Sequence, residues 1–269
     1  MLKILSIILI LSTSIYALNL SKCKAKLKNG IVQVKCIFKS SMIGEVEAKK
    51  RNQVPQYIKH IVARENGKIV YDININDGFG KHPFIKFQYK YLKSSSTLDL
   101  TVTDNTDKQT KISTKIKHSD VNSTIPDNGI IESSKNIDSS IWKVTKIEDA
   151  IETLYGSRLT HKSDNIKILS KDSTRMFIFP FSIKSNLDAQ SLAIFIGGKS
   201  KVTLAVFSTV NDSPINYYFT NVKSPVLEYN KDITTAITVV VKDKEGKLHR
   251  ADFPIEFISG CQSHCYGGQ

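Results

Sequence analysis

Alternation of apolar and polar residues is the main pattern along the chain. Short segments in which every second residue is apolar are separated by turn-forming pairs such as Asn-Gly and Asp-Asn. In the first half, the expected strands form a hairpin over Lys24–Phe38 and then cover Tyr57–Glu65, Lys68–Asn74, Phe84–Tyr89, Thr97–Thr103 and Gln109–Ile116. No helix is predicted there. Short strands with a turn about every 8–12 residues are typical of an immunoglobulin-like β-sandwich.

The first hairpin also predicts a disulfide. Asn29 and Gly30 suit the two positive φ angles of a type I′ turn. That turn sets a register in which Cys23 lies opposite Cys36 at a non-hydrogen-bonded pair, where the Cα atoms are about 4.5 Å apart. This separation lies within disulfide range, so we predict a structural Cys23–Cys36 bond.

The second half repeats the strand pattern after a short helix. Thr145-Lys-Ile-Glu148 is a capping box, apolar residues then recur at helical spacing, and Gly156 ends the helix. The expected strands are Arg175–Ile183, Ser191–Ile196, Val202–Phe207, Ile215–Thr220, Ile233–Lys242 and Leu248–Ile258. Pro180 indicates that the first of them is an edge strand.

These segments predict an all-β fold with two immunoglobulin-like β-sandwich domains, the second preceded by a short helix. Residues 1–17 have the apolar core and small-residue cleavage site of a signal peptide, so export is expected. A serine-rich stretch is typical of a linker; it contains Asn122 in an acidic-extended glycosylation sequon, whose use is left open. The expected divisions are 1–17 signal peptide, 18–118 first sandwich, 119–140 linker, 141–258 second sandwich and 259–269 C-terminal arm.

The charge of the chain narrows the expected partners. The formal net charge is +13, but the lysines are spread along the sequence and not gathered in blocks. For an exported protein this favours acidic proteins or small anions as partners over nucleic acid. No later stretch is apolar and long enough to span a membrane.

The last ten residues carry the candidate chemistry. Gly260, Gly267 and Gly268 give the backbone freedom, so Cys261 and Cys265 are expected on a flexible arm. The nearby His264, when protonated, would favour the thiolate of Cys265. No acidic residue follows Glu256 to oppose it.

Several short motifs of the first half resemble the SoxZ family of thiosulfate-oxidation proteins over residues 22–117. They are Lys24-Ala-Lys-Leu-Lys-Asn-Gly30, Val32-Gln-Val-Lys35, Met42-Ile-Gly44, Val54-Pro55, Asn66-Gly-Lys68, Pro83-Phe84 and Asp104-Asn105. Their order and spacing agree with the family. One segment departs from it, because Ser40-Ser41-Met42 stands where SoxZ has His-Pro-Met.

The second half is similar to the SoxY family. The resemblance rests on Asp149-Ala-Ile-Glu-Thr-Leu-Tyr-Gly156, on the strand order and on the Gly/Cys tail. The family tail is Gly-Gly-Cys-Gly-Gly; here Ser259-Gly260-Cys261 resembles its front and Cys265-Tyr-Gly267-Gly268 its back. The chain therefore resembles a fusion of SoxZ with SoxY, in that order.

This resemblance implies a periplasmic carrier, not an enzyme, that holds thiosulfate-derived sulfur covalently on a tail cysteine and needs no cofactor. The implied partners are SoxXA, SoxB and SoxCD-like enzymes. Cys265 reaches further and precedes the diglycine, which favours it as the carrier, with Cys261 as a resolving or protecting thiol. Cys261, however, stands at the family's distance from the last strand, so the assignment is left open. The oligomeric state is also left open, a homo-oligomer included.

Two other classes of function fit the tail. Cys261, His264 and Cys265 are soft ligands for copper or zinc, although three ligands on a flexible segment make a poor closed site. A Cys-x-x-x-Cys pair also fits a thiol–disulfide redox module, although the sequence lacks the βαβ setting of thioredoxins. The order Cys-x-x-His-Cys excludes the Cys-x-x-Cys-His motif of a c-type haem site.

Overall fold

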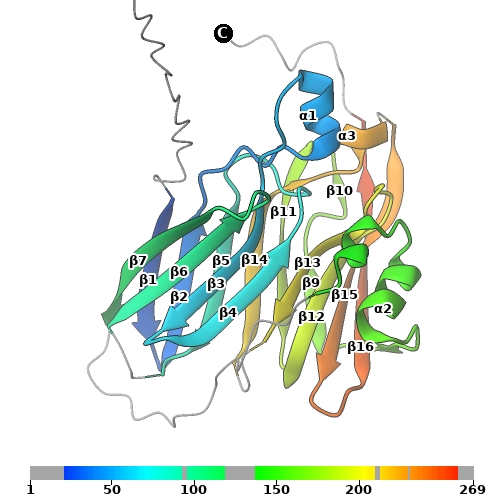
Figure 1. Ribbon diagram of the computed structural model, residues 1–269. Coiled ribbons are helices and arrows are strands. Elements are labelled where there is room, and N and C mark those ends of the chain that lie inside the picture. Colours follow the sequence, from blue (N-terminus) through cyan, green and yellow to red (C-terminus); the bar gives the residue numbers. More distant parts are fainter. Residues whose placement is uncertain (1–20, 93–95, 119–136, 210–212, 230, 260–269) are drawn as a thin grey trace, which may run out of the picture.

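A computed structural model describes residues 21–92, 96–118, 137–209, 213–229 and 231–259. The predicted signal peptide, most of the predicted linker with Asn122, and residues 260–269 lie outside the described residues. The described chain is mostly β-strand, with short helices at its periphery (Figure 1). No helix in the described ranges is long and apolar enough to cross a membrane.

The strands of the first half lie close to the predicted positions. They are β1 (Lys22–Lys28), β2 (Ile31–Ile37), β3 (Ile58–Glu65), β4 (Lys68–Ile75), β5 (Phe84–Lys90), β6 (Thr97–Asp104) and β7 (Gln109–His118). A short helix, α1 (Glu45–Arg51), connects β2 to β3. Along β5, Ile85, Phe87 and Tyr89 are buried and the residues between them are half-buried, which is the alternation that the sequence shows.

The second half also follows the predicted order. Its helices are the 3₁₀ helix η2 (Ser139–Lys143), α2 (Ile147–Tyr155) and α3 (Val226–Tyr229). Its strands are β8 (His161–Lys162), β9 (Ile166–Leu169), β10 (Ser173–Thr174), β11 (Ile178–Ser185), β12 (Ala189–Ile196), β13 (Thr203–Ser208), β14 (Ile215–Lys223), β15 (Ile233–Asp243) and β16 (Leu248–Phe257). Helix α2 packs Ala150 and Ile151 against the outer side of the sheet, next to Phe195 and Val240.

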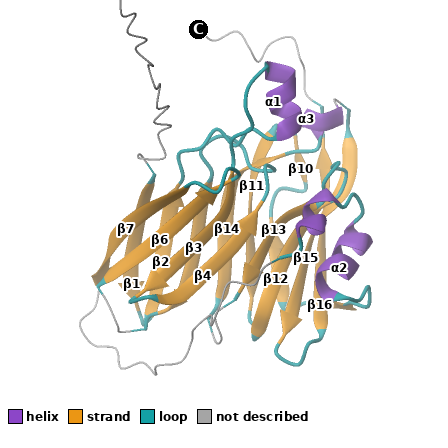
Figure 2. Cartoon of the chain, viewed as in Figure 1, coloured by secondary structure: helices purple, strands orange, loops and turns teal. Residues whose placement is uncertain are grey.

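The strands form two layers with one hydrophobic core between them, so the predicted β-sandwich fold is confirmed (Figure 2). One layer runs β16-β15-β12-β13-β4-β3-β6-β7, and the other runs β1-β2-β5-β14-β11-β9. A parallel pairing of β1 with β7 connects the layers along one side.

Each layer continues from the first half into the second. In one layer β13 pairs with β4, from Ala205 opposite Ile75 to Ser208 opposite Asp72. In the other layer β14 pairs with β5. Strand pairing in both sheets therefore joins the two halves.

Aromatic rings from both halves fill the core at this junction. Tyr71 of β4 stacks on Phe87 of β5, with ring centroids 3.8 Å apart. Phe207 of β13 stacks on Tyr217 of β14 at 4.7 Å, and the ring of Tyr71 meets both at steep angles. Buried aromatic pairs in such geometries contribute beyond their area burial, so this cluster holds the two halves together.

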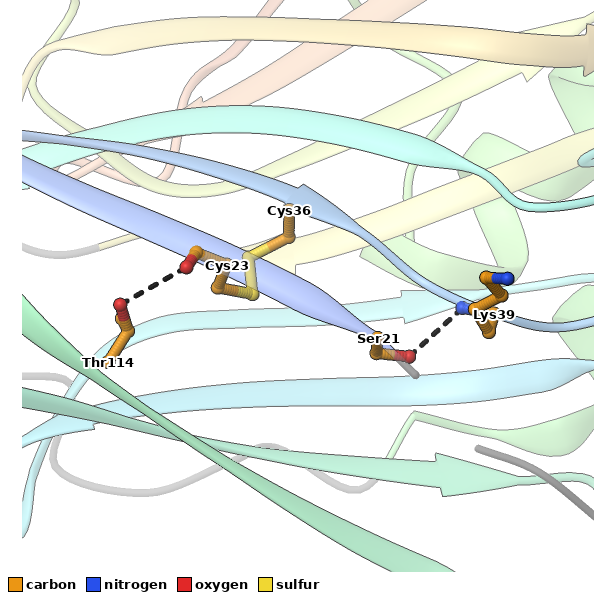
Figure 3. Close-up of a disulfide and its surroundings, with 5 residues drawn as sticks. All are labelled: Ser21, Cys23, Cys36, Lys39 and Thr114. Atoms are coloured by element: carbon orange, nitrogen blue, oxygen red, sulfur yellow. Dashed lines mark hydrogen bonds between the residues drawn. A yellow bond between two sulfur atoms is a disulfide. The ribbon is translucent and has the colours of Figure 1, made fainter. Parts of the chain in front are cut away.

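The first hairpin has the predicted turn and register. Asn29 and Gly30 have φ angles of 49° and 73°, and Cys23 lies opposite Cys36. The two form a disulfide with a Cα–Cα distance of 4.2 Å, so the predicted bond is confirmed. Figure 3 shows the bond between β1 and β2, with the Thr114 hydroxyl donating to the carbonyl of Cys23 at 3.1 Å.

Removal of this disulfide is expected to lower the free energy of unfolding by about 2 to 3 kcal/mol, because the bond restricts the unfolded chain. Urea unfolding of the oxidised protein, before and after reduction by a phosphine, measures the change without altering the sequence. Peptide mapping without reduction is the control and should recover Cys23 linked to Cys36. Free alkylation of both cysteines under native conditions would contradict the register.

The prediction of no helix in the first half is wrong, because α1 occupies Glu45–Arg51. The helix is short, and Ala48 is its only buried residue, so the sequence carries no apolar periodicity there. Asn52 ends it in the left-handed conformation, with its N–H directed to the carbonyls of Ala48 and Lys49. Contacts with the second half, described below, hold the helix in place.

Two local predictions in the second half also need correction. β11 as a whole is not an edge strand, since it pairs with β14 and, over 182–185, with β9; Pro180 lies outside the β9 pairing. The proline lies instead at a register shift between Phe179 and Phe181, where a bulge accommodates a residue without an N–H. The predicted capping box does not form: the N-cap of α2 is Lys146, without a side-chain hydrogen bond. Gly156 ends α2 as predicted, at φ 73°.

Candidate functional site

The predicted functional residues fall into two groups. The structure brings Cys23 and Cys36 together in the disulfide, while Gly260, Cys261, His264, Cys265, Gly267 and Gly268 lie outside the described residues. The described chain reaches Ser259, whose backbone N–H and hydroxyl both donate to one oxygen of Asp232, at 2.7 and 2.6 Å. These two hydrogen bonds lower the pKa of Asp232. They fix Ser259, the last described residue before the cysteines, next to the start of β15.

A cavity of about 470 Å³ lies between α1 and α3, at one end of the sandwich. We call it the α1–α3 cavity. The residues that line it are Gly44, Val46, Glu47, Lys50, Arg51, Asn76, Asp77, Gly78, Lys199, Ser200, Lys201, Lys223, Ser224 and Glu228. Both halves thus contribute to its wall, and Figure 1 shows α1 and α3 adjacent at this end.

Lys223, at the end of β14, connects the two halves across the cavity. Its ammonium donates to the carbonyl oxygen of Met42 at 2.6 Å and to Glu47 of α1 at 2.9 Å. Glu47 also pairs with Arg51 at 2.8 Å, one helical turn further on. The carboxylate of Glu47 is therefore shared between two cations, which holds α1 against the second half.

The segment Ser40-Ser41-Met42, which departs from the SoxZ pattern, lies beside this contact. Ser41 donates to the carbonyl of Gln56, and the backbone N–H of Met42 is directed to the hydroxyl of Ser40. Met42 is fully buried and adopts φ 52°. Its carbonyl is thereby turned toward Lys223, so this segment supports the cavity wall.

Glycines let the loops of the wall approach closely. A Cβ on Gly44 would lie 1.6 Å from a carboxylate oxygen of Asp77, so Gly44 leaves room for that side chain. The N–H of Gly78 donates to Asn76 at 2.7 Å. A Cβ on Gly78 would lie 3.4 Å from the ammonium nitrogen of Lys199, which places that ammonium against the same loop.

Lys199 is the most unusual residue in the wall. It follows Gly198, which turns the chain between β12 and β13 at φ 73°, and only 8% of its surface is exposed. Its ammonium makes no hydrogen bond or ion pair with the described residues. The pKa of Lys199 is lowered to about 8, mainly by burial; Glu228 and Asp77 oppose this lowering, and the positive charge of Lys223 adds to it.

Ser224 supplies a second unpartnered polar group. It is 1% exposed, and its hydroxyl has no hydrogen-bond partner among the described residues. Most buried hydroxyls are hydrogen-bonded. An unpaired hydroxyl and an unpaired ammonium in one cavity wall indicate a place where a polar ligand would satisfy both.

Other positions are weaker candidates for a functional site. A second cavity, of about 290 Å³, lies under α2 and has two charged residues in its wall, Asp138 and Lys242. His60 is held by a hydrogen bond with buried Asp72 at 2.9 Å, which is a structural role. Among the residues that the structure describes, no group of three His, Cys, Asp or Glu side chains is placed to hold a metal.

The sequence analysis did not identify the α1–α3 cavity. The run Gly197-Gly198-Lys199-Ser200-Lys201 between two strands was the available signal, since paired glycines with lysines often form a tight, polar turn. That signal alone does not distinguish a solvated turn from a binding site. The distinction depends on α1 and Gly78, which come from the other half of the chain.

Comparison with protein families finds a match in the first half. Residues 21–115 match the family model described as sulphur oxidation protein SoxZ. The match covers about a third of the chain. None of the curated proteins matches the chain.

Solved structures resemble the chain only distantly. A tetra-tandem repeat from the extending region of a large adhesion protein is 11% identical, with a TM-score of 0.27, and covers 88% of this chain. The chain spans 49% of that structure's length. Murine CEACAM1b is 5% identical, with 88% and 100% of the two chains covered and a TM-score of 0.22. The N-terminal periplasmic domain of ScsB from Proteus mirabilis is 13% identical, with 87% and 91% covered and a TM-score of 0.22. Likenesses at this level carry no functional argument.

Proposed function

We propose that this protein is a periplasmic sulfur carrier of the Sox system, with a SoxZ-like first half and a SoxY-like second half. The observation that carries the proposal is the SoxZ match over residues 21–115, in a chain whose two sheets continue into a second half that precedes a cysteine-bearing tail. Two partner subunits of one carrier would be replaced by one chain. The shared core around Tyr71 and Phe207 supports a single working unit.

The proposed chemistry takes place on a cysteine of the tail, with Cys265 as the carrier and Cys261 as the resolving or protecting thiol. In the loading step, the cysteine thiolate and thiosulfate form an S–S bond and give Cys-S-S-SO₃⁻. Two electrons leave and are accepted by a haem enzyme of the SoxXA class. In the release step, water attacks the sulfonate sulfur. Sulfate and two protons are released, and Cys-S-S⁻ remains on the carrier.

The carrier itself turns over no substrate in this proposal and needs no resident cofactor. Hydrolysis belongs to a SoxB-like enzyme, and oxidation of the remaining sulfur belongs to a SoxCD-like enzyme. A thiol that serves several enzymes needs thiolate character and access. The absence of acidic residues after Glu256 supports the first requirement, and the departure of the tail from an exposed Ser259–Asp232 contact supports the second.

The substitution Cys265→Ser is expected to abolish loading. The mature full-length protein is incubated with thiosulfate and an extract that contains active Sox enzymes, and the C-terminal peptide is analysed by mass spectrometry. The wild type should carry a thiosulfonate or a sulfane sulfur that a reductant removes. Cys261→Ser should keep the adduct and change its rate of release.

The outcomes separate the carrier from its alternatives. The Cys23–Cys36 disulfide is the internal control, since it should stay intact in every variant. An adduct lost only in Cys261→Ser would reverse the roles of the two cysteines. Equal loss of copper or zinc binding in both variants would favour a metal-binding module. If neither cysteine carries sulfur with active enzymes present, the proposal is wrong.

A further inference from the structure

Two of the three carboxylates of the α1–α3 cavity, those of Glu47 and Glu228, are bonded to protein groups. Glu47 is shared by Arg51 and Lys223. Glu228 accepts a hydrogen bond from the backbone N–H of Ser200 at 2.8 Å. Asp77 fills the space above Gly44, as shown above. The wall has five cationic and three acidic side chains in total, so the unengaged charge in the cavity is positive.

Lys199 concentrates that positive charge inside the cavity. A largely buried ammonium without a hydrogen-bond partner is costly, since burial removes most of its water and the charges of Glu228 and Asp77 compensate only in part. Lysines are almost never buried in this way unless they are paired. An anion beside the ammonium would remove most of the cost. Ser224 lines the same cavity, and its buried, unpaired hydroxyl can donate a hydrogen bond to an anion there.

We propose that the α1–α3 cavity is a binding site for a small sulfur oxyanion, such as sulfate, thiosulfate or a terminal sulfonate. The ammonium of Lys199 supplies the charge-assisted hydrogen bond, and Ser224 supplies a neutral donor. Lys201, Lys50 and Arg51 add positive charge at the wall. The anion site follows from the cavity wall alone, whereas the choice of a sulfur oxyanion rests on the proposed function.

The position of the site leaves two sources for the oxyanion. One is an ion free in solution. The other is the sulfonate end of an adduct on the cysteine-bearing segment, because the chain leaves the sandwich nearby. Phe257 at the end of β16 pairs with Ile233 of β15. Ile233 in turn packs on Gly198, where an added Cβ would lie 2.7 Å from it. The exit of the segment and the Lys199 turn are therefore neighbours.

Isothermal titration calorimetry with sodium sulfate and sodium thiosulfate, at constant ionic strength in chloride, tests the site in the mature full-length protein. Lys199→Met should weaken binding at least tenfold, and Ser224→Ala about three- to tenfold, with circular dichroism unchanged. Lys167→Met is the matched control: it removes one charge from an exposed position on β9 and should leave the affinity unchanged. Affinities equal to wild type in both Lys199→Met and Ser224→Ala would overturn the inference. So would an equal loss in Lys167→Met, since that indicates a non-specific effect of net charge.

A second arm of the experiment identifies the source. Tetrathionate converts a thiolate to Cys-S-S-SO₃⁻ and releases thiosulfate, so it loads the protein without Sox enzymes. If loaded wild type no longer binds free sulfate, and the double variant Cys261→Ser/Cys265→Ser treated in the same way still does, the tail adduct occupies the site. If loaded protein binds free sulfate normally, the site serves the free ion. Both results support an oxyanion site, and failure of enzymatic loading affects only the proposed carrier function.

Discussion

Replacement of Phe207 with alanine is expected to lower the free energy of unfolding by about 3 to 5 kcal/mol, and to do so for both halves together. The ring is 1% exposed and stacks on Tyr217, and it also meets Tyr71 of the first half at 6.1 Å. Its strand, β13, pairs with β4 of the first half. The substitution therefore leaves a cavity where the two halves share one core.

Urea unfolding with two probes measures this coupling. The single tryptophan, Trp142, reports on the second half by fluorescence. Hydrogen exchange at the amides of β3 reports on the first half. Phe253→Ala is the control, because Phe253 is only half-buried on β16 and should cost much less. If the amides of β3 stay protected at urea concentrations at which Trp142 fluorescence reports unfolding, the two halves unfold separately.

Lys199→Met is expected to stabilise the protein at pH 7 by about 3 kcal/mol, and this gain should disappear above pH 10. The pKa of Lys199 is lowered from 10.5 to about 8, and each pKa unit corresponds to about 1.4 kcal/mol. Below pH 8 both folded and unfolded chains carry the charge, so the folded state bears the full cost of burying it. Between pH 8 and 10.5 the unfolded chain holds a proton that the folded chain has lost, so wild-type stability rises with pH.

The comparison is made by urea unfolding at pH 7 and pH 10, in buffers free of sulfate and phosphate. The charged groups around Lys199 are Glu228, Lys223 and Asp77, and they are the same in both proteins. Other titrations therefore cancel in the difference between variant and wild type. Addition of sulfate at pH 7 should stabilise wild type more than the variant. A difference that is the same at both pH values would show that Lys199 is not desolvated.

Local patterns in the sequence determined the strands, the first hairpin and its disulfide. The Asn29-Gly30 turn sets the register of β1 against β2. This register places Cys23 opposite Cys36. Alternation then assigns faces, as on β11, where Phe179, Phe181 and Ile183 are buried. These features need only contacts that are close along the chain or that repeat with period two. For the tail, the sequence gives the cysteines and their neighbours, and the choice between Cys261 and Cys265 stays a prediction.

The tertiary structure decided how the halves join and where the oxyanion site lies. Strand alternation does not indicate which edges pair, so the β4–β13 and β5–β14 pairings could not be predicted from it. Helix α1 has one buried residue, and its position depends on Lys223, which is far away in the sequence. Lysine and serine are usually exposed, so nothing local marks Lys199 and Ser224 as buried. They become a site only because the joined sheets bring α1 and Gly78 against the turn after β12, which removes water from both groups.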